Sequence, residues 1–159
     1  MRNKMIDFSN GQPTSDLFLK EFLRCPKFDD TDIDKFFYYT AKKGNLSLRQ
    51  KLASLFDIGA HFNEENIMVT HGALGGLNIV FHFLRNSGVE VCFVRNPTYK
   101  EALSVVRSHG IEIVEIPLLG NGNIDFISLQ EVMKQYNHTC FYLIPTLNNP
   151  DGYTVPNRD

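Results

Sequence analysis

Three segments of the sequence carry residues that could hold an anion and an aromatic ring, and each follows an apolar run. The apolar runs and the segments that follow them are Ile67–Val69 before Gly72-Ala73-Leu74, Val91–Val94 before Asn96-Pro97-Thr98-Tyr99, and Cys140–Ile144 before Asn148-Asn149-Pro150. Polar groups that follow parallel strands meet at one edge of a sheet, where open α/β proteins bind their ligands. The spacing therefore predicts one site built from three loops.

The turn over residues 69–76 predicts a phosphate site. It reads Val-Thr-His-Gly-Ala-Leu-Gly-Gly and leads into a segment with helical periodicity. Free N–H groups and the positive end of a helix dipole attract an anion at such a turn, and Gly72 and Ala73 allow a phosphate to approach the backbone closely. The turn matches neither GxGxxG nor the P-loop pattern, so a packing role for its glycines is the alternative.

Tyr99 and Asn149 are the other candidate residues of this site. Tyr99 would place an aromatic ring at the start of a helix, although its spacing with Ala102, Leu103 and Val106 also fits a core position. Asn149 precedes a proline, which a simple turn would explain. Three loops at one rim support a binding role better than any one of these residues does.

Other chemistries have little support in the sequence. The five histidines have no partner at i+4, and no GxSxG pattern occurs. Cys92 and Cys140 lie in apolar runs without metal-ligand spacing, which favours a reducing cytoplasm. A formal net charge of -2 gives no reason to expect nucleic acid as a partner, and no apolar stretch is long enough to span a membrane.

The apolar pattern predicts an α/β fold. Of the 159 residues, 43% are hydrophobic and 21% charged, which is typical of globular proteins. Short apolar runs alternate with helix-period segments from residue 66 onward, as in a mainly parallel sheet with helices on both faces. The run Ile111–Ile116 alternates in part, which indicates an edge strand. We expect the segment around Leu77 and Phe81 to be the most enclosed helix, because its apolar surface is wide.

The two ends of the sequence differ in pattern. Residues 1–45 are interpreted as an N-terminal arm and connecting loops, with one short helix-like piece at Leu17–Leu23. Residues 46–159 are interpreted as the first part of an α/β domain, with a soft boundary near Gly44. A last helix is predicted to begin at Ser128, which has capping-box spacing with Glu131.

With these residues in view, the chain resembles the class I/II aminotransferases, the fold-type-I family of pyridoxal-phosphate enzymes. Five segments carry the resemblance in order: residues 7–13, Tyr39 with Gly44 and Leu48-Arg49, residues 66–73, residues 96–99 and residues 145–152. The opening is most similar to 2-aminoadipate-type transaminases and to aminotransferase-like domains of bacterial regulators. The resemblance implies part of the large domain of a pyridoxal-phosphate-dependent transferase, with a sheet that is incomplete in this chain.

The resemblance also implies pyridoxal 5'-phosphate as cofactor and assigns roles to the candidate residues. The N–H groups of Gly72, Ala73 and Leu74 would cradle its phosphate. Tyr99 would stack on the pyridine ring, and Asn149 would hydrogen-bond the phenolic oxygen of that ring.

Further roles follow from the same resemblance. Tyr39 would reach the phosphate held by the neighbouring subunit of a homodimer, and the backbone at Gly11 would lie near the substrate carboxylate. Family enzymes often have cis peptide bonds at the positions of Pro97 and Pro150, so we expect both bonds to be cis.

Two departures and one missing group modify these expectations. His71 stands where Ser or Asn is commoner, and Asp151 replaces the usual Thr, which would put a carboxylate beside the ring and weaken anion binding. The family's Schiff-base Lys, pyridine-binding Asp and substrate-binding Arg follow the Asn-Pro motif, so no catalytic residue is assigned. The chain is therefore expected to be an inactive N-terminal fragment, in which the strand at Ile67 would lack a neighbour.

Three functions remain open from the sequence. The first is an aminotransferase fragment, from an enzyme that moves an amino group between an amino acid and a 2-oxo acid. The second is a small phosphate- or nucleotide-binding α/β module of flavodoxin-like type. The third is a non-catalytic truncated subunit that pairs with a full-length relative through residues 1–45.

Overall fold

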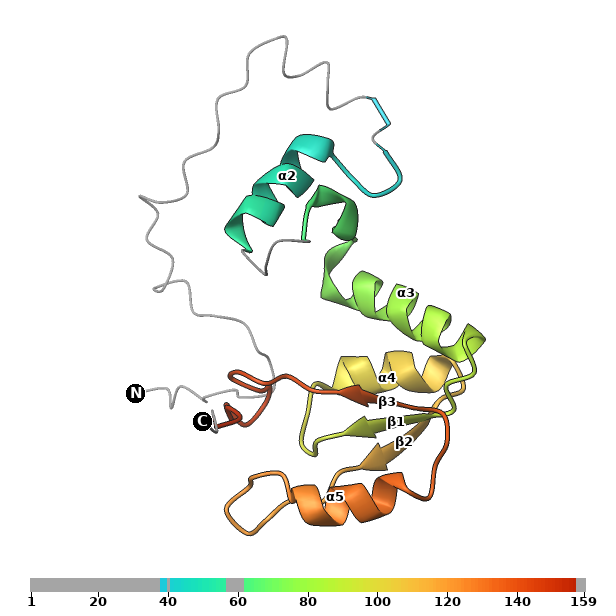
Figure 1. The fold of residues 1–159 in the computed structure, drawn as a ribbon, viewed down its shortest axis with the longest axis vertical. Coiled ribbons are helices and arrows are strands. Elements are labelled where there is room, and N and C mark those ends of the chain that lie inside the picture. The colour runs from blue at the N-terminus through green and yellow to red at the C-terminus, as the bar shows by residue number, and fades with distance from the viewer. Residues whose placement is uncertain (1–37, 40, 57–61, 157–159) are drawn as a thin grey trace, which may run out of the picture. The chain divides into compact units, whose positions relative to one another are not determined.

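The computed structural model describes residues 38–39, 41–56 and 62–156 (Figure 1). The chain divides into two compact units, Met1–Thr40 and Ala41–Asp159, and every helix and strand given below lies in the second. The predicted helix-like piece at Leu17–Leu23 and the candidate residue Gly11 lie outside the described residues.

Helices and parallel strands alternate in the larger part of the second unit. The elements are α3 (Gly72–Asn86), β1 (Val91–Val94), α4 (Lys100–Ser108), β2 (Glu112–Glu115), α5 (Phe126–Met133) and β3 (Thr139–Tyr142). The sheet has the order β2-β1-β3, and β1 pairs in parallel with both neighbours (Figure 1). The predicted α/β class is confirmed, and β2 lies at an edge as its partial alternation indicates.

Strand β1 forms the centre of the core because helices cover both of its faces. All four of its residues are buried. On one face, Cys92 and Val94 pack against Phe81 of α3 and Val106 of α4. A strand buried on both sides needs apolar residues at successive positions, which explains why this run does not alternate.

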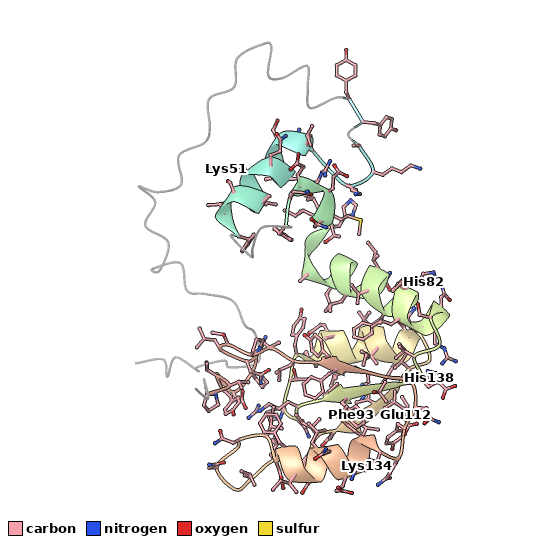
Figure 2. The ribbon with its side chains drawn as sticks, viewed as in Figure 1. Lys51, His82, Phe93, Glu112, Lys134 and His138 are labelled. Atoms are coloured by element: carbon pink, nitrogen blue, oxygen red, sulfur yellow. The ribbon has the colours of Figure 1, made fainter. Side chains whose placement is uncertain are left out.

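Helix α5 covers the opposite face of the sheet. Phe93 points to that side, where Leu129 of α5 belongs to the same buried cluster (Figure 2). The rings of Phe93 and Tyr136 meet edge to face, with centroids 5.7 Å apart. This arrangement of an aromatic pair is more favourable than direct stacking.

Helix α3 is less enclosed than its apolar pattern predicts. Phe81 is its buried residue, whereas Ile79, Val80 and Phe83 are 46%, 50% and 67% exposed. Helix α4, by contrast, places Ala102 fully inside the core. The prediction was wrong because α3 is apolar around more of its circumference than the described part of the chain covers.

The strand predicted at Ile67–Val69 is absent from the sheet within the described residues. Ile67 is extended, with φ of −110° and ψ of 133°. The N–H of Val69 donates to the carbonyl oxygen of Lys43 at 2.9 Å, and the segment makes no ladder with β1, β2 or β3. The prediction was wrong because a strand requires a neighbour for its backbone groups, and an apolar run does not supply one.

Helix α2 (Leu46–Leu55) and the 3-10 helix η3 (Glu64–Asn66) form a small substructure. Arg49 connects them, since its buried guanidinium donates to the carbonyl oxygen of Glu64 and lies 3.3 Å from a carboxylate oxygen of Glu65. The ion pair with Lys43 at 2.9 Å also engages Glu65, and hydrogen bonds from both cations lower the pKa of Glu65.

Helix α5 begins two residues before the predicted start at Ser128. Asp125 is its N-cap, and its carboxylate accepts hydrogen bonds from the N–H groups of Ile127 and Ser128. The hydroxyl of Ser128 also donates to Asp125, and these hydrogen bonds lower the pKa of that carboxyl group. A carboxylate satisfies the free N–H groups of a helix start and complements its dipole, so Asp125 takes the capping position.

Candidate functional site

The loops that follow β1 and β3 are joined at the carboxyl edge of the sheet. Asn148 is 1% exposed, and its side-chain amide donates to the carbonyl oxygen of Pro97 at 2.9 Å. The hydroxyl of Thr98 donates in turn to the side-chain oxygen of Asn148 at 3.3 Å. Because Tyr99 and Asn149 are the next residues in each loop, the structure brings their two segments together.

The side chains of Tyr99 and Asn149 are differently placed. Tyr99 is the N-cap residue of α4 and is half-buried. It lies close to Tyr142 of β3, whose pKa is raised by burial and further by Tyr99. Asn149 is exposed, and its side chain makes no hydrogen bond to any residue in the described ranges. Its amide is therefore available to a ligand.

Both peptide bonds expected to be cis have that geometry. Asn96-Pro97 and Asn149-Pro150 are cis, and each lies in the loop that directly follows a strand. This confirms the expectation carried over from the resemblance.

The start of α3 presents backbone donors to solvent. Gly72 has a φ of 73°, in the left-handed region that favours glycine, and its N–H donates to the carbonyl oxygen of Thr70 at 2.9 Å. The N–H groups of Ala73 and Leu74 have no acceptor in the part of the chain that the structure describes. His71 is the N-cap residue, but its side chain makes no capping bond. Two of the three predicted phosphate donors are thus free, and the third is engaged in a turn.

Asp151, which departs from the family pattern, is held by groups of the protein itself. One carboxylate oxygen lies 2.6 Å from Nη1 of Arg95, and the other accepts from Asn148 at 2.7 Å and from the N–H of Tyr153 at 3.1 Å. The hydrogen bond from Asn148, followed by that from Arg95, lowers the pKa of Asp151 to about 2. Its charge is balanced by Arg95, so we do not expect it to repel a cofactor phosphate.

Arg95 and Asn148 are site residues that the sequence analysis missed. Arg95 is 4% exposed, and the ring of Tyr153 lies 4.1 Å from its guanidinium carbon. A signal was present, because a basic and an acidic residue, Arg95 and Asp151, each follow an apolar run that was predicted to be a strand. Nothing in the local pattern of Asn148 distinguishes it from an ordinary turn residue.

The remaining expectations concern other parts of the chain. Tyr39 is fully exposed and belongs to the first compact unit, while Gly11 is outside the described residues. No group of three or more potential metal-ligating side chains occurs among the described residues. None of the helices described is long and apolar enough to cross a membrane.

A parallel sheet with helices on both faces and polar loops at its carboxyl edge defines the class of α/β proteins that hold ligands at this edge. The family described as Aminotransferase class I and II matches residues 3–159. The chain belongs to this family. Pyridoxal 5'-phosphate is the family's cofactor, as the resemblance implies.

Individual relatives agree with this assignment. The chain is 26% identical to the 2-aminoadipate transaminase of Thermus thermophilus, with 98% of this chain and 38% of the relative covered. It is 34% identical to aromatic-amino-acid aminotransferase 1 of Thermococcus litoralis, with 74% and 29% covered. It is similar to the crystal structure of an amino transferase from Eubacterium rectale, with a TM-score of 0.68, 30% identity, and 80% and 32% covered.

The chain spans only part of the length of these relatives. It covers 38% of the Thermus thermophilus transaminase, 29% of the Thermococcus litoralis enzyme and 32% of the Eubacterium rectale chain. The match therefore concerns one portion of each of these proteins.

Proposed function

We propose that this chain forms the phosphate- and ring-binding side of a pyridoxal-phosphate site in an aminotransferase. The enzyme would transfer an amino group between an amino acid and a 2-oxo acid. The observation that carries the proposal is the buried Asn148, which bonds the loop of Tyr99 to the loop of Asn149. Residues 46–159 would be the first part of the large domain.

The start of α3 fits the phosphate end of the cofactor. The free N–H groups of Ala73 and Leu74 would donate to phosphate oxygens, and the helix dipole would add about 0.3 to 1 kcal/mol. Gly72 would form the turn through its left-handed backbone conformation. Its own N–H would not bind phosphate, because it donates to the carbonyl oxygen of Thr70.

The joined loops fit the ring end of the cofactor. When bound, pyridoxal phosphate supplies a reactive carbonyl and an electron-withdrawing ring. Tyr99 would stack on that ring, and the free side-chain amide of Asn149 would donate to its phenolic oxygen. The side-chain amide of Asn148 already donates to the carbonyl oxygen of Pro97, so these two groups would hold the loops together. Tyr99 and Asn149 would then contact the cofactor.

The remaining expectations form part of the same proposal. Tyr39 would act across a homodimer, on the phosphate of the neighbouring subunit, and Gly11 would lie near the substrate carboxylate. The enzyme would work in the cytoplasm, without nucleic acid or membrane as partners. Substrates would be an amino acid and a 2-oxo acid.

We further propose that these 159 residues do not transaminate by themselves. The reaction needs a lysine to hold the cofactor and move a proton, and none of the lysines here stands in the family's Ser/Thr-rich context. The test is borohydride treatment of the purified chain with pyridoxal phosphate, followed by peptide mapping. Labelling of one single lysine, together with turnover of an amino acid, would contradict this part of the proposal.

Binding is best tested with 4-deoxypyridoxine 5'-phosphate, because this analogue lacks the aldehyde that reacts with surface lysines. We expect its fluorescence to report saturable binding to the chain, and unphosphorylated 4-deoxypyridoxine, which differs only by the phosphate, to bind at least about tenfold more weakly. Tyr99→Ala and Asn149→Ala should weaken binding, whereas Tyr38→Ala, on an exposed tyrosine, is the control. Equal affinity for the two compounds would rule out the proposed phosphate site.

A further inference from the structure

The polar network between the two loops contains one ion pair of unequal burial. Nη1 of Arg95 lies 2.6 Å from Oδ2 of Asp151, and the two side chains are 5% and 29% exposed. Ion pairs on the surface contribute little to stability, but a buried guanidinium that loses its partner keeps an uncompensated charge. Burial of Arg95 therefore favours the state in which its guanidinium stays paired with Asp151.

The guanidinium of Arg95 is held from several directions. Besides the ring of Tyr153, the carbonyl oxygens of Pro97 and Gly122 each lie 3.4 Å from one of its terminal nitrogens. Its Nε is buried and has no hydrogen-bond partner among the described residues. An unpaired buried donor costs free energy, and the contacts of the two terminal nitrogens and of the guanidinium face oppose that cost.

Asp151 transmits this constraint to the loop after β1. Its Oδ1 accepts from the amide of Asn148 at 2.7 Å, and the same amide donates to the carbonyl oxygen of Pro97. Arg95 belongs to the first loop and Asp151 to the second, so the ion pair closes a ring of contacts that crosses between the loops twice. Hydrogen bonds in such a ring depend on one another.

We propose that Arg95 and Asp151 are positioning residues that clamp the two loops together and thereby hold Tyr99 and Asn149 at a fixed separation. This inference rests on the proposed function, since it assigns the clamp to the cofactor site. Neither residue is a catalytic group, because both act through Asn148 and Pro97. Without the clamp, the loops would remain at the sheet edge but would sample more than one arrangement.

The first test measures hydrogen exchange by mass spectrometry and needs no cofactor. We expect Asp151→Asn to raise exchange about tenfold in residues 95–102 and in residues 145–155. Asp125→Asn makes the same chemical change at the N-cap of α5 and is the matched control; it should leave exchange in both segments unchanged, because an asparagine oxygen also caps a helix. A rise confined to residues 145–155 would overturn the clamp, because it would show that the first loop does not depend on Asp151.

The second test measures the affinity for 4-deoxypyridoxine 5'-phosphate at a temperature where every variant is folded. Asp151→Asn should weaken binding about tenfold, and adding Arg95→Gln should weaken it little further, since one clamp is already open. Arg95→Lys should retain more affinity than Arg95→Gln, because it keeps the positive charge that faces Asp151. Since every variant is folded at this temperature, a loss of stability alone would leave the affinity unchanged. Loosened loops with unchanged affinity would overturn the positioning role.

The two tests separate the two proposals. Failure of the wild-type chain to bind the analogue would count against the proposed function and would remove the cofactor from this inference. Hydrogen exchange would still decide whether Arg95 and Asp151 clamp the loops.

Discussion

The loops at the sheet edge and the start of α3 differ in whether their polar groups are hydrogen-bonded. In the loops, the buried amide of Asn148 is paired with the carbonyl oxygen of Pro97 and the carboxylate of Asp151. At the start of α3, the N–H groups of Ala73 and Leu74 have no acceptor in the described part of the chain. The protein's own hydrogen bonds therefore organise the two loops, whereas the start of α3 has N–H groups that a ligand could accept from.

The difference indicates how the work of binding would be divided. Preorganised groups add specificity because their positions cost little to fix when the ligand arrives. Free N–H groups at a helix start add affinity for an anion, because they can donate hydrogen bonds to it without first breaking others. We therefore expect changes in the loops to affect stability and geometry together, and changes at α3 to affect phosphate binding with little effect on stability.

The largest effect should come from the strand that carries the first loop. Phe93→Ala should reduce the free energy of unfolding by about 3 to 5 kcal/mol, because it empties a fully buried aromatic position beside Tyr136. Urea denaturation followed by circular dichroism measures this loss. Phe83→Ala, at a position that is 67% exposed, should cost far less; equal losses would show that β1 is not the centre of the core.

A smaller effect should separate two adjacent asparagines. Asn148→Ala should reduce the free energy of unfolding by about 1 to 3 kcal/mol, because it leaves the buried hydroxyl of Thr98 without its acceptor and removes the hydrogen bond to Pro97. Asn149→Ala, at an exposed residue, should leave stability nearly unchanged and weaken binding of the phosphate analogue. The same denaturation and fluorescence measurements apply to both. If Asn149→Ala were the more destabilising change, the proposed division between the two residues would be wrong.

The start of α3 should show the opposite behaviour. Ala73→Pro removes one free N–H in the first turn, where proline is tolerated, and should weaken analogue binding about tenfold with little change in stability. Ser47→Pro makes the same change in the first turn of α2 and serves as control. Comparable affinity in both variants would show that α3 does not contact the phosphate.

The smallest effect is the contribution of Asp151 to stability as a function of pH. Its pKa is about 2 in the folded chain, below its ordinary value of 3.8, so the folded state favours the carboxylate. The stabilisation is present above the unfolded value and is lost as the pH falls from about 4 towards 2. Thermal unfolding between pH 5 and pH 2.5 should therefore show a shallower decline for Asp151→Asn than for the wild type. Parallel curves would contradict this contribution.

The strands show how far local pattern predicts the fold. Val91–Val94 has the bounds expected from its apolar run, because a strand covered on both faces must be apolar throughout. Ile67–Val69 has the same local pattern and joins no strand of the described sheet, because pairing depends on a neighbour that no local pattern specifies. Helix α5 shows a smaller error of the same kind, since Ser128 and Asp125 both have the chemistry of a cap and the structure uses Asp125.

The features of the candidate site likewise fall into those that the local sequence predicts and those that depend on the tertiary fold. The sequence by itself determined the alternation of helices and strands, the order of the three loops and the resemblance to aminotransferases, because residue type and spacing along the chain carry these features. Tertiary structure decided that Asn148 is buried between two loops and that Asp151 faces Arg95, which is 56 residues away. Contacts of this kind depend on which strands become neighbours, so only the folded chain reveals them.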